Sequence, residues 1–257
     1  MLRRYILLLV CSSIFTLAQT NQPVTITSAA SASVGLAPES LATATGMNLA
    51  MGAARAQSLP WPTTLGGVTI QLTDSASVPR LAGLLFVSPT QINFEIPAGT
   101  ALGPATVTIN NGQQTLSAQV QIQSVAPGLF SVDAQGIAAA TAIRIVIPTQ
   151  TQSPVPVFLC LDSFAGCNLV PIDPGVDAPV YLSFYATGIR GRSSLGNVTV
   201  TIGSVTVQPT YAGPQPQFPG LDQVNVPLLL SLRGAGVVNV TVTVDGITSN
   251  AVKIQVM

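Results

Sequence analysis

The sequence predicts an all-β protein, and three observations lead to that fold class. Short apolar runs are punctuated throughout the 257 residues by 20 prolines and 22 glycines, as in strands joined by tight turns. Polarity comes from Thr, Ser, Gln and Asn rather than from charged residues, which are only 7% of the chain, and Thr suits strands. Residues 91–96 alternate strictly, which predicts a half-buried strand with Ile92, Phe94 and Ile96 in a core and the polar residues between them in water.

The strands of the first half follow from such runs and from the breakers between them. Pro89 and Pro97 bound the alternating strand, because a residue without an N–H cannot sit inside a β-ladder. Asn111-Gly112 predicts a hairpin, because both residues tolerate positive φ. Residues 46–67 read as a long loop in which prolines exclude helix. The expected strands are 24–27, 40–45, 68–72, 84–87, 91–96, 105–110 and 116–122.

The second half reads in the same way. Residues 138–147 and 155–161 are expected to form a hairpin with each other, and residues 171–179 to form a loop. Asp245-Gly246 predicts a second hairpin turn. The remaining expected strands are 180–186, 198–202, 205–208, 223–226, 237–244 and 251–256.

An internal repeat predicts the architecture. Three pairs of landmarks recur at similar spacings along the chain: Gln91 with Gln223, Asn111 with Asp245, and Gly46 with Gly188. About seven short strands per copy indicate two tandem immunoglobulin-like β-sandwiches, although neither copy has the Cys–Trp–Cys pattern of antibody domains. The expected modules are residues 19–128 and 129–257, with Ile92 and Val224 at equivalent positions.

Residues 1–18 read as a secretory signal peptide. Arg3 and Arg4 give a positive start, and the apolar residues 5–17 are fewer than the roughly 20 that a membrane span needs. A membrane anchor and a lipid-modified Cys11 are the alternatives, and Val10 is too large for the position before such a cysteine. We therefore expect a secreted or cell-surface protein, with the periplasm as a further location, and no membrane span after signal cleavage.

Two cysteines, Cys160 and Cys167, follow the signal segment. In an exported chain such a close pair predicts a disulfide. The two thiols could also bind a metal, but no other soft ligand is available to complete a site. Because the closed loop is short, the expected stabilisation is about 2.5 kcal/mol.

The chain has no histidine, and its nine basic and nine acidic residues cancel. The absence of histidine excludes Ser-His-Asp and Cys-His arrangements and the commonest general base. A net charge of zero provides no field to attract nucleic acid or an anionic membrane. We therefore expect a protein that is not an enzyme, has no cofactor and does not bind nucleic acid.

Several segments together resemble one family: residues 60–68, 85–97, 126–130, 188–192 and 211–225. They are similar to the Solibacter-type uncharacterised C-terminal domain of acidobacterial exported proteins, over most of the chain that follows the signal. Trp61 and Thr90 depart from the pattern, in which a smaller apolar residue and Gly are usual. The resemblance implies immunoglobulin-like modules of the kind found in transcription factors and plexins, an extracellular location and no assigned activity.

Aromatic residues in proline-rich loops are the first binding candidates. Trp61, the only tryptophan, could stack on a sugar ring or could plug one end of a sandwich core. The loop that carries Tyr211 and Phe218 is stiffened by three prolines and could contact a glycan or a protein, or simply cover one end of the second module.

Charged residues supply weaker candidates. Arg190 and Arg192 could bind carboxylates of a polysaccharide or a partner; pairing with Asp222 or plain solvation are the alternatives. Three aspartates could ligate calcium, but they lack regular spacing and suit turns, so no metal site is expected: Asp162, Asp173 and Asp177. A hydrolase that uses Asp222 and Asp245 is the weakest hypothesis.

The sequence favours two functional hypotheses over the others. The first is an exported, non-enzymatic interaction or structural protein that binds a protein partner or associates with itself. The second is a carbohydrate-binding module that uses Trp61 or the Tyr211–Phe218 loop. The burial of Trp61 distinguishes them.

Overall fold

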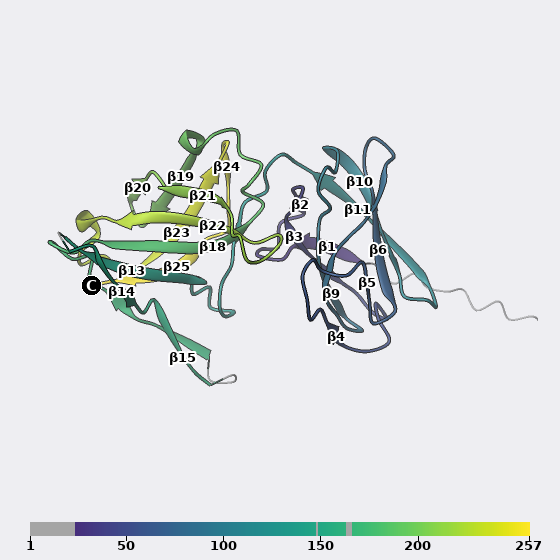
Figure 1. Cartoon of the computed structure of the whole chain (residues 1–257), viewed down its shortest axis with the longest axis horizontal. Helices are drawn as coiled ribbons and strands as arrows, with labels where there is room; N and C mark the ends of the chain where they lie inside the picture. Colours follow the sequence, from purple (N-terminus) through teal and green to yellow (C-terminus); the bar gives the residue numbers. More distant parts are fainter. Residues whose placement is uncertain (1–23, 148, 163–165) are drawn as a thin grey trace, which may run out of the picture.

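The computed structural model describes residues 24–147, 149–162 and 166–257 (Figure 1). The predicted signal peptide lies outside the described residues. Within them the chain is all-β, and the helical segments are two single 3₁₀ turns, Leu195–Asn197 and Leu230–Leu232. No helix in this part of the chain is long and apolar enough to cross a bilayer. The predicted fold class is confirmed.

Two sheets form the first module. One has the strand order β1 (Thr25–Ser28), β3 (Leu41–Thr45), β9 (Gln91–Glu95), β8 (Leu84–Val87), β4 (Ala54–Arg55). The other has the order β2 (Gly35–Leu36), β11 (Thr115–Ile122), β10 (Gly103–Asn110), β6 (Val68–Thr73), β5 (Thr64–Leu65), with β7 (Pro79–Leu81) also paired to β6.

Two further sheets form the second module. One has the order β14 (Thr151–Val155), β13 (Ala140–Val146), β18 (Val180–Thr187), β22 (Asp222–Leu228), β21 (Tyr211–Pro214), with β12 (Gly128–Leu129) paired to β18. The other has the order β17 (Pro171–Ile172), β25 (Val252–Val256), β23 (Gly236–Val244), β19 (Val198–Ile202), β20 (Val205–Val207), with β24 (Ile247–Thr248) paired to β23.

The two modules share one topology. The order β1-β3-β9-β8 corresponds to β13-β18-β22-β21, and β2-β11-β10-β6-β5 corresponds to β17-β25-β23-β19-β20. In each module a short strand, β2 or β17, joins the second sheet by parallel pairing with the last strand. This is the strand arrangement of an immunoglobulin-like sandwich. Ile92 on β9 pairs with Ala44, and Val224 on β22 pairs with Phe184 of the corresponding neighbour, so the two residues are equivalent as predicted.

Each module has its own apolar core, because the strands alternate between buried and outward residues. Phe94 is among the largest fully buried side chains of the first core, and Phe184 among those of the second. The polar residues of β9 face outward as predicted, although Gln91, Asn93 and Glu95 are half-buried rather than fully exposed.

The predicted hairpin between residues 138–147 and 155–161 is wrong. β13 pairs instead with β14, residues 151–155, and β15 (Phe158–Asp162) pairs with β16 (Gly166–Leu169) in a separate two-stranded sheet. β14 is an edge strand whose residues are almost all exposed, so it has no alternation of apolar and polar residues that would reveal it. Pro154 is tolerated there because an edge strand leaves some N–H groups unpaired.

Other differences are smaller. The predicted loop at residues 46–67 contains the two-residue strands β4 and β5. The Cys160–Cys167 disulfide is present and joins directly opposed residues of β15 and β16.

Candidate functional site

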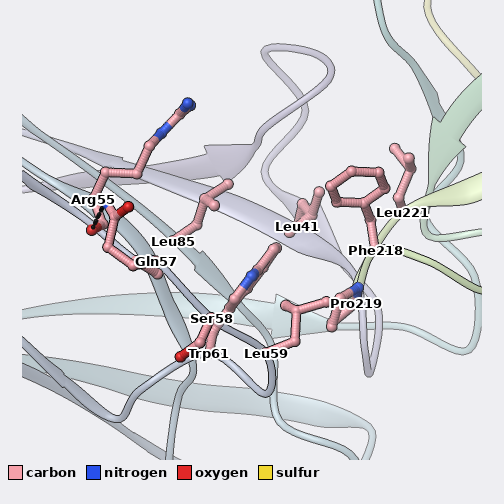
Figure 2. Close-up of a pocket in the computed structure, with 11 residues that line it drawn as sticks. Leu41, Arg55, Gln57, Ser58, Leu59, Trp61, Leu85, Phe218, Pro219 and Leu221 are labelled. Atoms are coloured by element: carbon pink, nitrogen blue, oxygen red, sulfur yellow. Dashed lines mark hydrogen bonds between the residues drawn. The ribbon is translucent and has the colours of Figure 1, made fainter.

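An apolar groove of about 390 Å³ lies where the two modules meet (Figure 2). The first module contributes the segment from Arg55 to Trp61 together with Leu41 and Leu85, and the second module contributes Phe218, Pro219 and Leu221. Leu41 and Leu85 are outward residues of β3 and β8, so the groove is built on the outer face of the first sheet.

Trp61 lies in the wall of this groove. Its side chain is only 9% exposed, yet it does not belong to the core cluster of the first module. Gly83 packs closely against it, since a Cβ on Gly83 would lie 3.3 Å from Trp61 Cβ. Trp61 is therefore largely buried beside the groove, and little of its ring is accessible to a ligand there.

The loop of residues 215–221 forms the opposite wall and is closed by its own hydrogen bonds. The Gln215 N–H donates to the Leu221 carbonyl at 2.9 Å. The Gln215 side-chain oxygen accepts the N–H groups of Gln217 at 2.7 Å and Phe218 at 3.0 Å. This network holds Phe218 at the groove with 54% of its surface exposed. A preorganised exposed aromatic loses little entropy when a ligand covers it.

Gly220 brings this loop against the first module. A Cβ at Gly220 would lie 2.6 Å from Leu41 Cδ2, and its φ of +76° belongs to the left-handed region that favours glycine. Nearby, the buried Thr187 hydroxyl accepts the Leu41 N–H at 2.8 Å and donates to the Gly220 carbonyl at 2.8 Å. Thr187 thus joins β3 of one module to the loop of the other.

Arg190 is committed to the same junction. Its Nε donates to Asp222 Oδ1 at 2.8 Å, one Nη to the Leu221 carbonyl at 2.9 Å, and the other Nη approaches Glu39 of the first module at 3.5 Å. Burial raises the pKa of Asp222, against the lowering effects of Arg190 and of the Ile189 N–H. Arg190 therefore takes the alternative that pairs it with Asp222, and its guanidinium has an internal role.

Glu95 lies next to this ion pair. Burial raises the pKa of Glu95; the Arg190 charge opposes the shift and the Glu39 charge adds to it. The outward side of β9, read from sequence as facing water, is here drawn partly into the junction.

The candidate residues thus separate into two places. Trp61 and Phe218 meet across the groove. Tyr211 lies on the outward face of β21, where its hydroxyl donates to the Pro214 carbonyl at 2.5 Å. Arg192 belongs with Tyr211, because a Cβ built on Gly213 would lie 3.3 Å from both Arg192 Nη1 and the Tyr211 hydroxyl.

The acidic candidates are held in structural bonds. Asp245 accepts the Ser193 N–H and hydroxyl, and these two bonds lower its pKa. Asp173 accepts the Gly175 N–H and pairs with Arg233, which lowers its pKa too. Asp222 and Asp245 come from different sheets and have separate partners. Across residues 24–147, 149–162 and 166–257, no three His, Cys, Asp or Glu side chains gather as a metal site would require.

Sequence reasoning missed the residues that build the junction. Leu41, Thr187 and Gly220 come from three distant segments, and a contact of that kind leaves no local signal. The glycine at position 220 was one clue, since a glycine in a proline-rich loop often serves a positive φ.

Comparisons with known proteins find likeness in structure but not in sequence. No protein-family model matches the sequence, and no curated protein matches it. The crystal structure of bovine butyrophilin is similar over 91% of this chain and 99% of that chain, at 9% identity and a TM-score of 0.26. The fold assignment rests on the strand pairing described above, and the family resemblance read from the motifs stays a prediction.

Proposed function

We propose that this chain is an exported, non-enzymatic interaction protein whose groove between the modules accepts an apolar side chain of a protein partner. The observation that carries the proposal is the groove itself, with apolar walls supplied by both modules. Its volume of about 390 Å³ suits one or two large side chains. Buried apolar anchors of this kind supply most of the affinity in protein interfaces.

Exposure of the groove residues supports a partner. Leu59 is 49% exposed and Phe218 54% exposed on the two sides of one concave surface. An apolar surface that is both concave and accessible is a common feature of binding sites.

The chemistry of the chain supports a role without catalysis. The sequence has no histidine, and the buried carboxylate of Asp222 is held by Arg190 and the Ile189 N–H. Export is supported by the signal-like residues 1–18 and by the Cys160–Cys167 disulfide, because disulfides persist in oxidising compartments.

The alternative, a carbohydrate-binding module, loses one of its two sites. Trp61 is only 9% exposed, so little of its ring is accessible for a sugar to stack on. Phe218 belongs to the groove, so a glycan would have to use Tyr211 and its neighbours.

Site-specific photo-crosslinking tests the groove. A photoreactive phenylalanine analogue at Phe218 should capture one defined protein, while the same analogue at Leu102, equally exposed at 54% but outside the groove, should not. The Leu59→Ser variant should abolish capture from position 218. Equal capture from both positions, or none from position 218, would refute the proposal. A captured second copy would identify the partner as the chain itself.

A further inference from the structure

The outward face of the β13-β18-β22-β21 sheet collects every tyrosine that follows the predicted signal. Along β18 the core residues alternate with Tyr181 and Tyr185, which are partly exposed. Tyr211, 37% exposed, lies on the same face, because its neighbour Ala212 points into the core. The strand pairing places Tyr185 opposite Gln223, and Tyr211 opposite Asn225.

Amide groups lie between these rings. Gln223 Nε2 donates to Asn225 Oδ1 at 2.7 Å, which ties the two side chains together along β22. In the described part of the chain, neither the Gln223 side-chain oxygen nor the Asn225 side-chain nitrogen bonds another protein group. One acceptor and one donor are therefore left toward solvent.

A cation completes the surface at its β21 edge. Arg192 Nη1 lies beside the Tyr211 hydroxyl over Gly213. Arg192 Nε is buried without a hydrogen-bond partner, and none of the described carboxylates lies within ion-pair distance of this guanidinium. Arg190, two residues away, is by contrast fully engaged at the junction.

We propose that this face, defined by Tyr181, Tyr185, Tyr211, Gln223, Asn225 and Arg192, binds an extended polysaccharide that contains uronic acids. Sugar rings present apolar C–H faces that stack on tyrosines, and their hydroxyls match the fixed amides. A uronate carboxylate pairs with the Arg192 guanidinium, whose charge reaches Asp245 only at longer than ion-pair distance and whose fork geometry suits carboxylates. The site shares no residue with the groove and stands or fails independently of the groove proposal.

A second copy of the chain is a poorer occupant. The equivalent face of the first module is met by the loop of residues 215–221, which each chain already uses at its own junction. The corresponding connection in the first module is the short turn between β8 and β9, residues 88–90. The chain therefore has no spare loop to offer to the tyrosine face of another copy.

Affinity electrophoresis and calorimetry of the intact secreted protein test the proposal. The probes are polygalacturonate, alginate and hyaluronate, with fully methyl-esterified polygalacturonate as a neutral control that has the same backbone. We expect binding to at least one acidic polymer, and about tenfold weaker binding to its neutral form or by the Arg192→Gln variant. Lys253→Gln, which removes an exposed cation on β25 in the other sheet of the same module, should leave binding unchanged.

Tyr185→Thr tests the stacking. Threonine suits this position of the sheet, because Thr45 occupies the equivalent position in the first module. The substitution should weaken binding about tenfold while the thermal midpoint confirms folding. Phe218→Ser should leave polysaccharide binding intact, which separates this site from the groove. No binding to any of the three polymers, equal binding to the esterified form, or insensitivity to both Arg192→Gln and Tyr185→Thr would overturn the proposal.

Discussion

The β1-β3-β9-β8 and β13-β18-β22-β21 sheets are equivalent, and each contains the same Gln–apolar–Asn strand. Their outward faces differ in what surrounds them. In both modules the Gln donates to the Asn two residues on, at 2.8 Å from Gln91 to Asn93 and at 2.7 Å from Gln223 to Asn225. In the first module the neighbouring strand offers Thr43 and Thr45. In the second it offers Ser183 and Tyr185.

The difference between the faces lies in what covers them. Leu41, at one end of the first face, is 8% exposed because the Gly220 loop of the second module packs on it. Its equivalent, Tyr181, pairs with Pro227 and stays partly exposed. The same face of the duplicated sheet therefore packs against the other module in the first copy and is open to solvent in the second. Changes at the junction should therefore affect the first face and leave the second unaffected.

Arg190→Gln should have the largest effect. It leaves the Asp222 carboxylate buried without its cation, which should lower the free energy of unfolding by about 3–5 kcal/mol at neutral pH. Since burial already raises the pKa of Asp222, the native state takes up this proton more readily than the unfolded state, and the deficit should shrink as the pH falls through the native pKa. Urea unfolding at several pH values measures both effects. A deficit that grows on acidification would contradict the assignment.

Gly220→Ala should come next, at about 2–4 kcal/mol, from the contact with Leu41 and the left-handed backbone together. Gly234→Ala is the matched control, because its φ is +80° but no atom lies within 4 Å of its Cβ position. Small-angle scattering should show a more extended chain for the first variant only. The same profile for both would mean that Gly220 does not set the junction.

Thr187→Val should remove about 1–3 kcal/mol, because it leaves the Leu41 N–H and the Gly220 carbonyl without partners in a buried place. Hydrogen exchange at the Leu41 amide should accelerate, while exchange at Ala44 on the same strand should not. Unchanged exchange at both amides would show that the hydroxyl is dispensable.

Asp74→Asn should have the smallest effect, and it should distinguish the two modules by how their stability falls in acid. N–H groups, that of Ala101 foremost, together with Arg80, lower the pKa of Asp74 in the first module to about 2 from its ordinary value of 3.8. The stabilisation is complete above the unfolded pKa and is lost as the pH falls from 3.8 toward 2. Asp74→Asn should make the loss of stability with falling pH less steep. The fluorescence of Trp61, which lies in the same module, measures this loss. A loss as steep as that of the parent protein would refute this.

Strands with a clear alternation could be predicted from sequence, and so could the repeat. Residues 91–96 and 223–226 show their period because one side of each strand is buried and the other is not. β14 could not be predicted because an exposed edge strand has no buried side. β2 and β17 could not be predicted because a strand of two residues is too short to show an alternation.

The candidate site was only half predictable. Trp61 and Phe218 could be predicted as candidates because aromatic residues flanked by prolines stand out in a sequence. Their meeting across the groove depends on the Gly220 loop docking on Leu41, a contact between residues far apart in the chain. The tyrosine face was missed because Tyr181 and Tyr185 join Tyr211 only through the pairing of β18 with β22 and of β22 with β21.

Hydroxyl-radical footprinting of the intact protein would test the contrast between the two faces most directly. After correction for intrinsic reactivity, Leu41 should be protected, while Tyr181, Tyr185 and Tyr211 should be modified; the Gly220→Ala variant should expose Leu41 alone. Modification of Leu41 in the unaltered chain to the same extent as Tyr181, or protection of all three tyrosines, would contradict the account.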